Sequence, residues 1–163
     1  MITGACESSP GRRSSQTFSY VLILWCDDVL VELRRSKVPL SKGYYIYVGS
    51  ANIKRPYLRV MRHLMKSSKK LRWHVDYLTR VCDPISALLC GGVSEKTLYE
   101  ILVSSDYVTP SIESFGCSDY RGTHKTHLFK FCGGMESLHE VVGRLSSVLR
   151  ILCSEVEVFL NQK

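Results

Sequence analysis

The sequence of 163 residues lacks a long apolar run. Its longest apolar stretch is the seven residues Tyr20–Cys26, too short for a transmembrane helix. The N-terminus is rich in Ser, Gly and Arg without an apolar segment, so no secretory signal peptide is expected. Apolar residues make up 45 %, which excludes general disorder. We therefore expect one soluble, cytoplasmic domain with no membrane partner.

Paired cysteine motifs are also missing. The seven cysteines are scattered and odd in number, and none forms a Cys-x-x-Cys pair, so we expect reduced thiols in a cytosolic protein, most of them in the core. Cys117, His124, His127 and Cys132 could supply two sulfurs and two nitrogens to zinc. Their spacing, C-x6-H-x2-H-x4-C, matches no zinc module, and the non-metal interpretation is favoured.

Acidic residues are nearly absent from one long segment. Between Arg34 and Arg80 there are 13 Lys or Arg residues and one acid, Asp76, which is a net charge of +12, whereas the rest of the chain carries −5. A concentrated positive field attracts polyanions. A solvated face that keeps the protein soluble is the alternative, but the strong segregation favours nucleic acid.

Apolar periodicity predicts an α/β (α+β) domain with a small, mainly antiparallel sheet flanked by helices. Strands are expected at Ser19–Cys26, Val29–Arg35 (the hairpin partner of the first), Gly43–Gly49, Pro84–Cys90 and Thr126–Cys132. Helices are expected from Pro56, over Trp73–Arg80, from an N-cap at Ser94 to Val103, and from Met135 onward. Glu155–Leu160 fits either a helix or a strand. Trp73 and Tyr77 are expected in the core. Residues 1–17 are expected to be a disordered tail, 18–150 the domain and 151–163 a C-terminal extension.

Six short blocks follow one another in a specific order. They are Gly43–Ala51 (GYYIYVGSA), Arg59–Leu64 (RVMRHL), Lys70–Leu78 (KLRWHVDYL), a helix with Glu95, Ser114–Asp119 (SFGCSD) and Thr126–Phe129 (THLF). Together they resemble the GIY-YIG nuclease superfamily, and more closely an uncharacterised prokaryotic branch found alone or fused to an endonuclease III-type glycosylase. The resemblance covers about residues 18–132. Phe18 departs from it where the first motif has Gly, and Tyr120 where many relatives carry Cys.

The resemblance implies an active site. Tyr20 and Tyr47 match the two motif tyrosines, Arg59 matches the helix arginine, and His63 lies one turn further on. Glu95 matches the glutamate that binds Mg²⁺ (or Mn²⁺), although Glu100 lies on the same helix. The branch's own motifs, of unknown role, add Gly49, His74, Asp76, Ser118, Asp119 and His127.

These residue types suit phosphodiester hydrolysis. A tyrosine hydroxyl can orient or deprotonate water, an arginine can hold phosphate oxygens, and a glutamate can bind one hard cation. The expected function is that of a metal-dependent DNA endonuclease, or of a nuclease-like domain, in DNA repair. The expected substrate is DNA rather than RNA, and a DNA-repair glycosylase is a further expected partner. Phosphate contacts are expected from Lys54, Arg55, Arg62, Lys66, Lys69 and Lys70. Taken singly, each residue is more often structural than catalytic. The alternative is therefore a non-catalytic nucleic-acid-binding or repair-protein interaction module on the same fold.

Overall fold

A six-stranded antiparallel sheet with strand order β6-β7-β4-β1-β5-β8 organises the computed structural model, which describes residues 16–66, 70–120, 122–132 and 138–161. The sheet strands are β1 (Phe18–Cys26), β4 (Gly43–Ser50), β5 (Asp83–Gly91), β6 (Val108–Pro110), β7 (Leu128–Phe131) and β8 (Glu155–Leu160). A separate hairpin consists of β2 (Val29–Glu32) and β3 (Lys37–Leu40). The helices are α1 (Pro56–Leu64), α2 (His74–Val81), α3 (Glu95–Val103) and α4 (Leu138–Leu152), with a short 3₁₀ turn at Ser118–Tyr120. The predicted fold class is confirmed.

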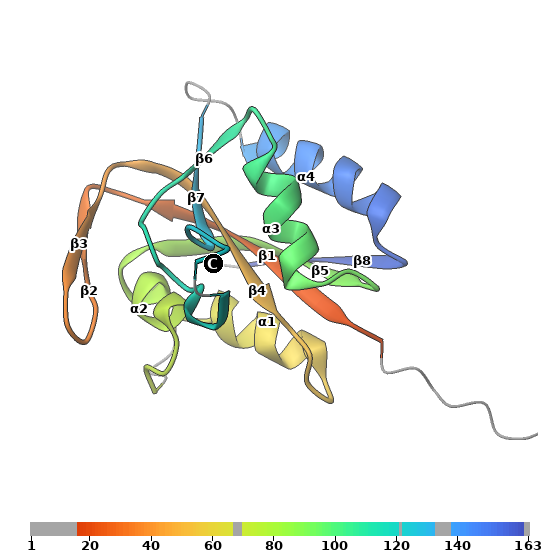
Figure 1. Cartoon of the computed structure of the whole chain (residues 1–163), viewed down its shortest axis with the longest axis horizontal. Coiled ribbons are helices and arrows are strands. Elements are labelled where there is room, and N and C mark those ends of the chain that lie inside the picture. Colours follow the sequence, from red (N-terminus) through yellow and green to blue (C-terminus); the bar gives the residue numbers. More distant parts are fainter. Residues whose placement is uncertain (1–15, 67–69, 121, 133–137, 162–163) are drawn as a thin grey trace, which may run out of the picture.

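Strand β1 is buried on both faces because helices cover both sides of the sheet. Leu22 and Leu24 point into a core shared with α1 and α2, whereas Val21 and Ile23 point into a second core with α3 and α4. Figure 1 shows the two helix pairs on opposite sides of the sheet. Residues on alternate positions of a strand face opposite ways, so a strand with two apolar faces reads as the continuous apolar run seen in the sequence.

The predicted hairpin between the first two strands is wrong. Both edges of β1 are taken by strands distant in sequence, β4 and β5. Strand β2 therefore pairs with β3 instead, in a two-stranded sheet where Val31 lies opposite Val38. Val31 is fully buried against the first core, which anchors this hairpin to the domain.

The segment Glu155–Leu160, which the sequence left open between a helix and a strand, is the strand β8. Strand β8 pairs with β5 along its whole length, so the expected C-terminal extension contributes an edge strand to the sheet. Residues 1–15 of the expected tail lie outside the described residues. Among the described residues, no helix is both long enough and apolar enough to cross a membrane.

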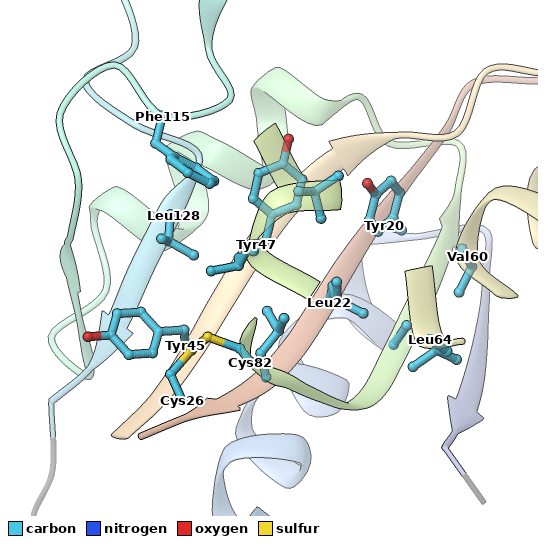
Figure 2. Packing of buried hydrophobic residues seen from close by; sticks show 14 of the residues in the cluster. Tyr20, Leu22, Cys26, Tyr45, Tyr47, Val60, Leu64, Cys82, Phe115 and Leu128 are labelled. Atoms are coloured by element: carbon cyan, nitrogen blue, oxygen red, sulfur yellow. A yellow bond between two sulfur atoms is a disulfide. The ribbon is translucent and has the colours of Figure 1, made fainter. Parts of the chain in front are cut away.

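Two disulfides correct the expectation of reduced thiols. Cys26 at the end of β1 is bonded to Cys82 after α2, with Cα atoms 4.5 Å apart (Figure 2). Cys90 in β5 is bonded to Cys153 after α4, with Cα atoms 5.6 Å apart. The partners lie 56 and 63 residues apart in sequence, so the packing of the helices on the sheet, and not local spacing, brings them together.

Candidate active site

One pocket of about 120 Å³ collects most of the predicted site residues. It lies where β1, β4, α1 and the beginnings of α2 and α3 meet the segment around the 3₁₀ turn. The predicted residues that line it are Tyr20, Tyr47, Gly49, Arg59, His63, His74, Glu95, Ser118 and Asp119. Ser50, Trp73, Val75 and Gly116 line it as well. Residues from separate parts of the sequence thus meet at one concave surface.

The two tyrosines come from neighbouring strands and are held in place by glycines. Figure 2 shows Tyr20 on β1 and Tyr47 on β4 with both hydroxyls at the same margin of the core. Their ring centroids are 6.3 Å apart. Gly49 lies directly opposite Tyr20 in the strand register, and a Cβ there would come within 2.4 Å of the Tyr20 hydroxyl. Gly116 has a left-handed φ of +76°, and a Cβ added there would lie 2.8 Å from the Tyr47 hydroxyl. Neither position has room for a side chain.

Both phenols are in their neutral form. Burial raises the pKa of Tyr20 well above its ordinary value, and the neighbouring Tyr47 adds to the rise. Burial likewise raises the pKa of Tyr47, helped by the negative charge of Glu95. Arg59 opposes both shifts but does not reverse them. The hydroxyls are therefore suited to orient a water molecule through hydrogen bonds. Together, the surrounding side chains do not lower the pKa of either phenol, so they do not turn it into a general base.

Arg59 lines the pocket from α1 and is held there by a hydrogen bond to the backbone. Its Nη1 donates a hydrogen bond to the backbone carbonyl of Ser50, at 2.8 Å, directly after β4. Pro56 begins the helix, as the sequence predicts, and the apolar face with Val60 and Leu64 is buried. Because this face packs on the sheet, the helix turns Arg59 toward the pocket.

The ion pair between Arg62 and the buried Asp76 lies next to His63, which packs against Tyr20. His63 stacks on the Tyr20 ring, with centroids 5.5 Å apart and planes inclined by 21°. Its Nδ1 lies 3.6 Å from Oδ1 of Asp76, which is fully buried. Both carboxylate oxygens of Asp76 accept hydrogen bonds from the Arg62 guanidinium, at 2.8 and 3.0 Å. Asp76, although predicted among the motif residues, thus lies one layer behind the pocket.

Asp76 is charged in spite of its burial. Desolvation raises its pKa, but the Arg62 guanidinium and the backbone N–H groups of Trp73 and Arg72 outweigh that effect and hold the pKa below its ordinary value. The same N–H bonds secure the beginning of α2, where Trp73 is the N-cap. Arg62, predicted to contact phosphate, is therefore committed in part to this internal ion pair.

Glu95 is the first residue of α3 and is held by a second buried cluster. Its Oε2 accepts a hydrogen bond from the Tyr120 hydroxyl at 3.2 Å, and its Oε1 lies 3.2 Å from His127 Nδ1. The other ring nitrogen of His127 lies 2.7 Å from His124 Nδ1. A proton on His127 Nδ1 is favoured by the carboxylate, which leaves Nε2 to accept from His124. Glu100, the sequence alternative, is exposed and lies near Lys96 instead.

His124 and Tyr120 were not expected to support the site. The His124 ring is stacked between Tyr99, at 3.8 Å, and Tyr120, at 4.1 Å. Burial lowers the pKa of His124, and His127 lowers it further, so its ring is neutral near pH 7. Nothing local in the sequence links the His124 and Tyr120 rings to Glu95, because Tyr120 lies 25 residues further along the chain and His124 lies beyond it.

The four residues weighed as a zinc set do not share a centre. Cys117 Sγ donates to the backbone carbonyl of His124, whereas Cys132 is exposed and donates to Thr109. The part of the chain that the structure describes contains no group of three or more His, Cys, Asp or Glu placed to hold a metal ion. Besides the imidazoles of His63 and His74, the pocket is lined by the side-chain oxygens of Glu95, Ser118 and Asp119. Such a set suits a hard cation held by one carboxylate together with water and substrate.

The residues predicted to contact phosphate differ in their exposure and in their partners. Lys54, Arg55 and Lys70 are exposed, and Lys66 forms an ion pair with Asp83. Lys69 lies outside the described residues. Trp73, expected in the core, is instead 56 % exposed, because it precedes α2 rather than packing within it.

The fold and the pocket thus define a class: an α+β protein with one pocket that joins an arginine, two neutral tyrosines and a carboxylate. A family model described as "Domain of unknown function DUF123" matches residues 19–150, and the chain belongs to this family. No curated protein and no solved structure matches the chain significantly.

Proposed function

We propose that this protein is a metal-dependent endonuclease of the GIY-YIG type that hydrolyses phosphodiester bonds in DNA. The observation that carries the proposal is the convergence of Tyr20, Tyr47, Arg59 and Glu95 in one pocket. These four residues come from β1, β4, α1 and α3, so their meeting does not follow from sequence proximity. They are the side chains that the resemblance to GIY-YIG nucleases implies.

Each side chain has a separate role in this reaction. Arg59 binds the non-bridging oxygens of the scissile phosphate through its planar guanidinium and stabilises the charge that develops there. The neutral hydroxyls of Tyr20 and Tyr47 orient the attacking water. Glu95 would hold the cation. Mg²⁺ or Mn²⁺, when bound, polarises the phosphate and stabilises the leaving oxygen. The His127 and Tyr120 contacts keep the Glu95 carboxylate at the pocket wall.

A binding module without catalysis is the second candidate. The buried, neutral phenols favour it, since neither tyrosine is an evident general base. The departure at Phe18 gives it little support. Phe18 packs against the first core and is not among the pocket-lining residues that the structure describes.

A cytoplasmic role in DNA repair, with a glycosylase as partner, remains part of the proposal. The two disulfides stand against this location, because disulfides are rare in reducing compartments. A thiol titration of denatured protein, prepared without reductant, separates the two cases: a cytoplasmic protein with reduced thiols shows all seven cysteines.

Nicking of supercoiled plasmid in the presence of Mg²⁺ or Mn²⁺ tests the nuclease. Glu95→Gln keeps the side-chain size but removes the charge that holds the cation, so we expect nicking to be abolished. Glu100→Gln is the matched control on the same helix, with its exposed side chain outside the pocket, and should nick as the wild type does. Equal nicking by both variants would assign the activity to another site or to a contaminant.

A further inference from the structure

A second hollow adjoins the candidate active site and carries a different chemistry. It has a volume of about 450 Å³ and is lined by four cations and three apolar side chains. The cations are Arg59, Arg62, Lys70 and Arg72, and the apolar residues are Ile53, Leu58 and Trp73. No acid is among the described residues that line this groove. The groove therefore combines a positive field with apolar contact surface.

Trp73 is the unusual member of this groove. It is 56 % exposed, whereas a large aromatic ring is normally buried or paired with a partner. Its backbone is not loose. The Trp73 N–H donates to the buried carboxylate of Asp76 at 3.0 Å, and the adjacent Arg72 N–H donates to the same oxygen at 2.9 Å. The structure thus presents an indole ring to solvent from a backbone fixed by the Asp76 ion pair.

The groove adjoins the pocket. Arg59 and Trp73 line both hollows, so a phosphate bound by Arg59 would lie beside the residues of the groove, Trp73 among them. Arg62 also faces the groove while one of its nitrogens donates to the backbone carbonyl of Lys70 at 3.1 Å. This bond ties the helix α1 to the segment before α2 and shapes the groove between them.

We propose that this groove binds an unpaired nucleotide beside the scissile phosphate, with its base stacked on Trp73; this rests on the proposed nuclease function. Phosphate binding alone requires cations and no aromatic ring. In a duplex the faces of each base are covered by its neighbours, so an exposed ring gains stacking area only from a base that has left the stack. The substrate is therefore single-stranded DNA or a duplex with an unpaired or displaced strand.

Metal-free binding of two strands of equal charge tests the groove. The probes are a 15-nucleotide thymidine strand, dT15, and an abasic strand of the same length. The protein carries Trp25→Phe, which leaves Trp73 as the single tryptophan of the two in the chain. We expect dT15 to quench the Trp73 emission and to bind roughly 5- to 150-fold more tightly than the abasic strand, the range for stacking of one base.

The variants separate stacking from charge. In the otherwise wild-type chain, Trp73→Ala should bind the two strands with equal affinity and keep the salt dependence of the wild type, because no phosphate contact is removed. Trp73→Phe should retain part of the preference. Because Trp73 is exposed, both substitutions should leave the fold intact, and circular dichroism checks this.

Three results would overturn the proposal that the groove stacks an unpaired base on Trp73. They are equal binding of both strands by the wild type, an unchanged preference in Trp73→Ala, and binding of poly-L-glutamate as tight as that of dT15. These results differ from a failure of the nuclease. Base-dependent binding without cleavage in any divalent metal would refute the nuclease and support the groove. Plasmid nicking without base-dependent binding would do the reverse.

Discussion

Replacement of Gly49 by alanine tests how the strand register places the pocket tyrosine. A Cβ at this position would lie 2.4 Å from both Cζ and Oη of Tyr20, about 1 Å closer than ordinary contact. The ring cannot move freely, because it is 2 % exposed and stacked on His63. Overpacking of this kind costs about 1–3 kcal/mol of the free energy of unfolding. We expect a loss of that size for Gly49→Ala in urea denaturation followed by circular dichroism.

Two controls separate this steric effect from a general effect of glycine replacement. Gly143 lies in α4 with nothing within 4 Å of an added Cβ, so Gly143→Ala should stabilise the protein by up to about 1 kcal/mol. In a Tyr20→Ala background the clash is absent, and Gly49→Ala should then cost much less than in the wild type. Equal costs in both backgrounds, or none in the wild type, would refute the reasoning.

The same substitution bears on catalysis. A displacement of the Tyr20 hydroxyl by about 1 Å should slow plasmid nicking by about 10²-fold, since reacting groups must be held in a narrow geometry. Cleavage at the wild-type rate by a stable Gly49→Ala variant would remove Tyr20 from the proposed mechanism.

Three further predictions follow from the site and its support. Arg59→Ala should slow nicking by about 10²-fold or more while lowering the salt slope of DNA binding by about one unit; equal losses in binding and cleavage would make Arg59 a binding residue only. Asp76→Asn should cost about 3 kcal/mol in urea denaturation, the low end for a broken buried pair because Arg62 keeps 35 % exposure. Since the folded pKa of Asp76 is lowered, its stabilisation is present above about pH 4 and is lost as the pH falls through the folded pKa, so wild type and variant should converge in acid; a constant difference would contradict this. Replacement of both Cys90 and Cys153 by serine should cost about 4 kcal/mol, as expected for a bridge that spans 63 residues, and reductant should have no further effect through this bridge.

Local signals in the sequence predicted most of the elements. Pro56 begins α1, and the Ser94 hydroxyl accepts a hydrogen bond from the Thr97 N–H at the beginning of α3. The apolar run Tyr20–Cys26 lies in the central strand β1. Such signals act over a few residues, so they predict an element without its partners. For this reason the strand at Val29 is predicted with the wrong partner, and the short strands β3 and β6 are not predicted.

The order of motifs also indicated nine of the residues that line the pocket, but not how they are held. The choice between Glu95 and Glu100 depended on which side of α3 faces Tyr120 and His127. The position of Trp73 depended on its place outside α2, anchored by Asp76.

Short segments of the sequence, through propensity, capping and motif order, thus specify the helices, the main strands and nine of the residues that line the pocket. Only packing in the folded protein determines the two disulfides, the pairing of the strands, the raised pKa values of the two pocket tyrosines and the exposure of Trp73. Each of these depends on what surrounds a side chain after packing. Burial and charge at a given atom are sums over residues far apart in the chain, and local patterns do not contain them.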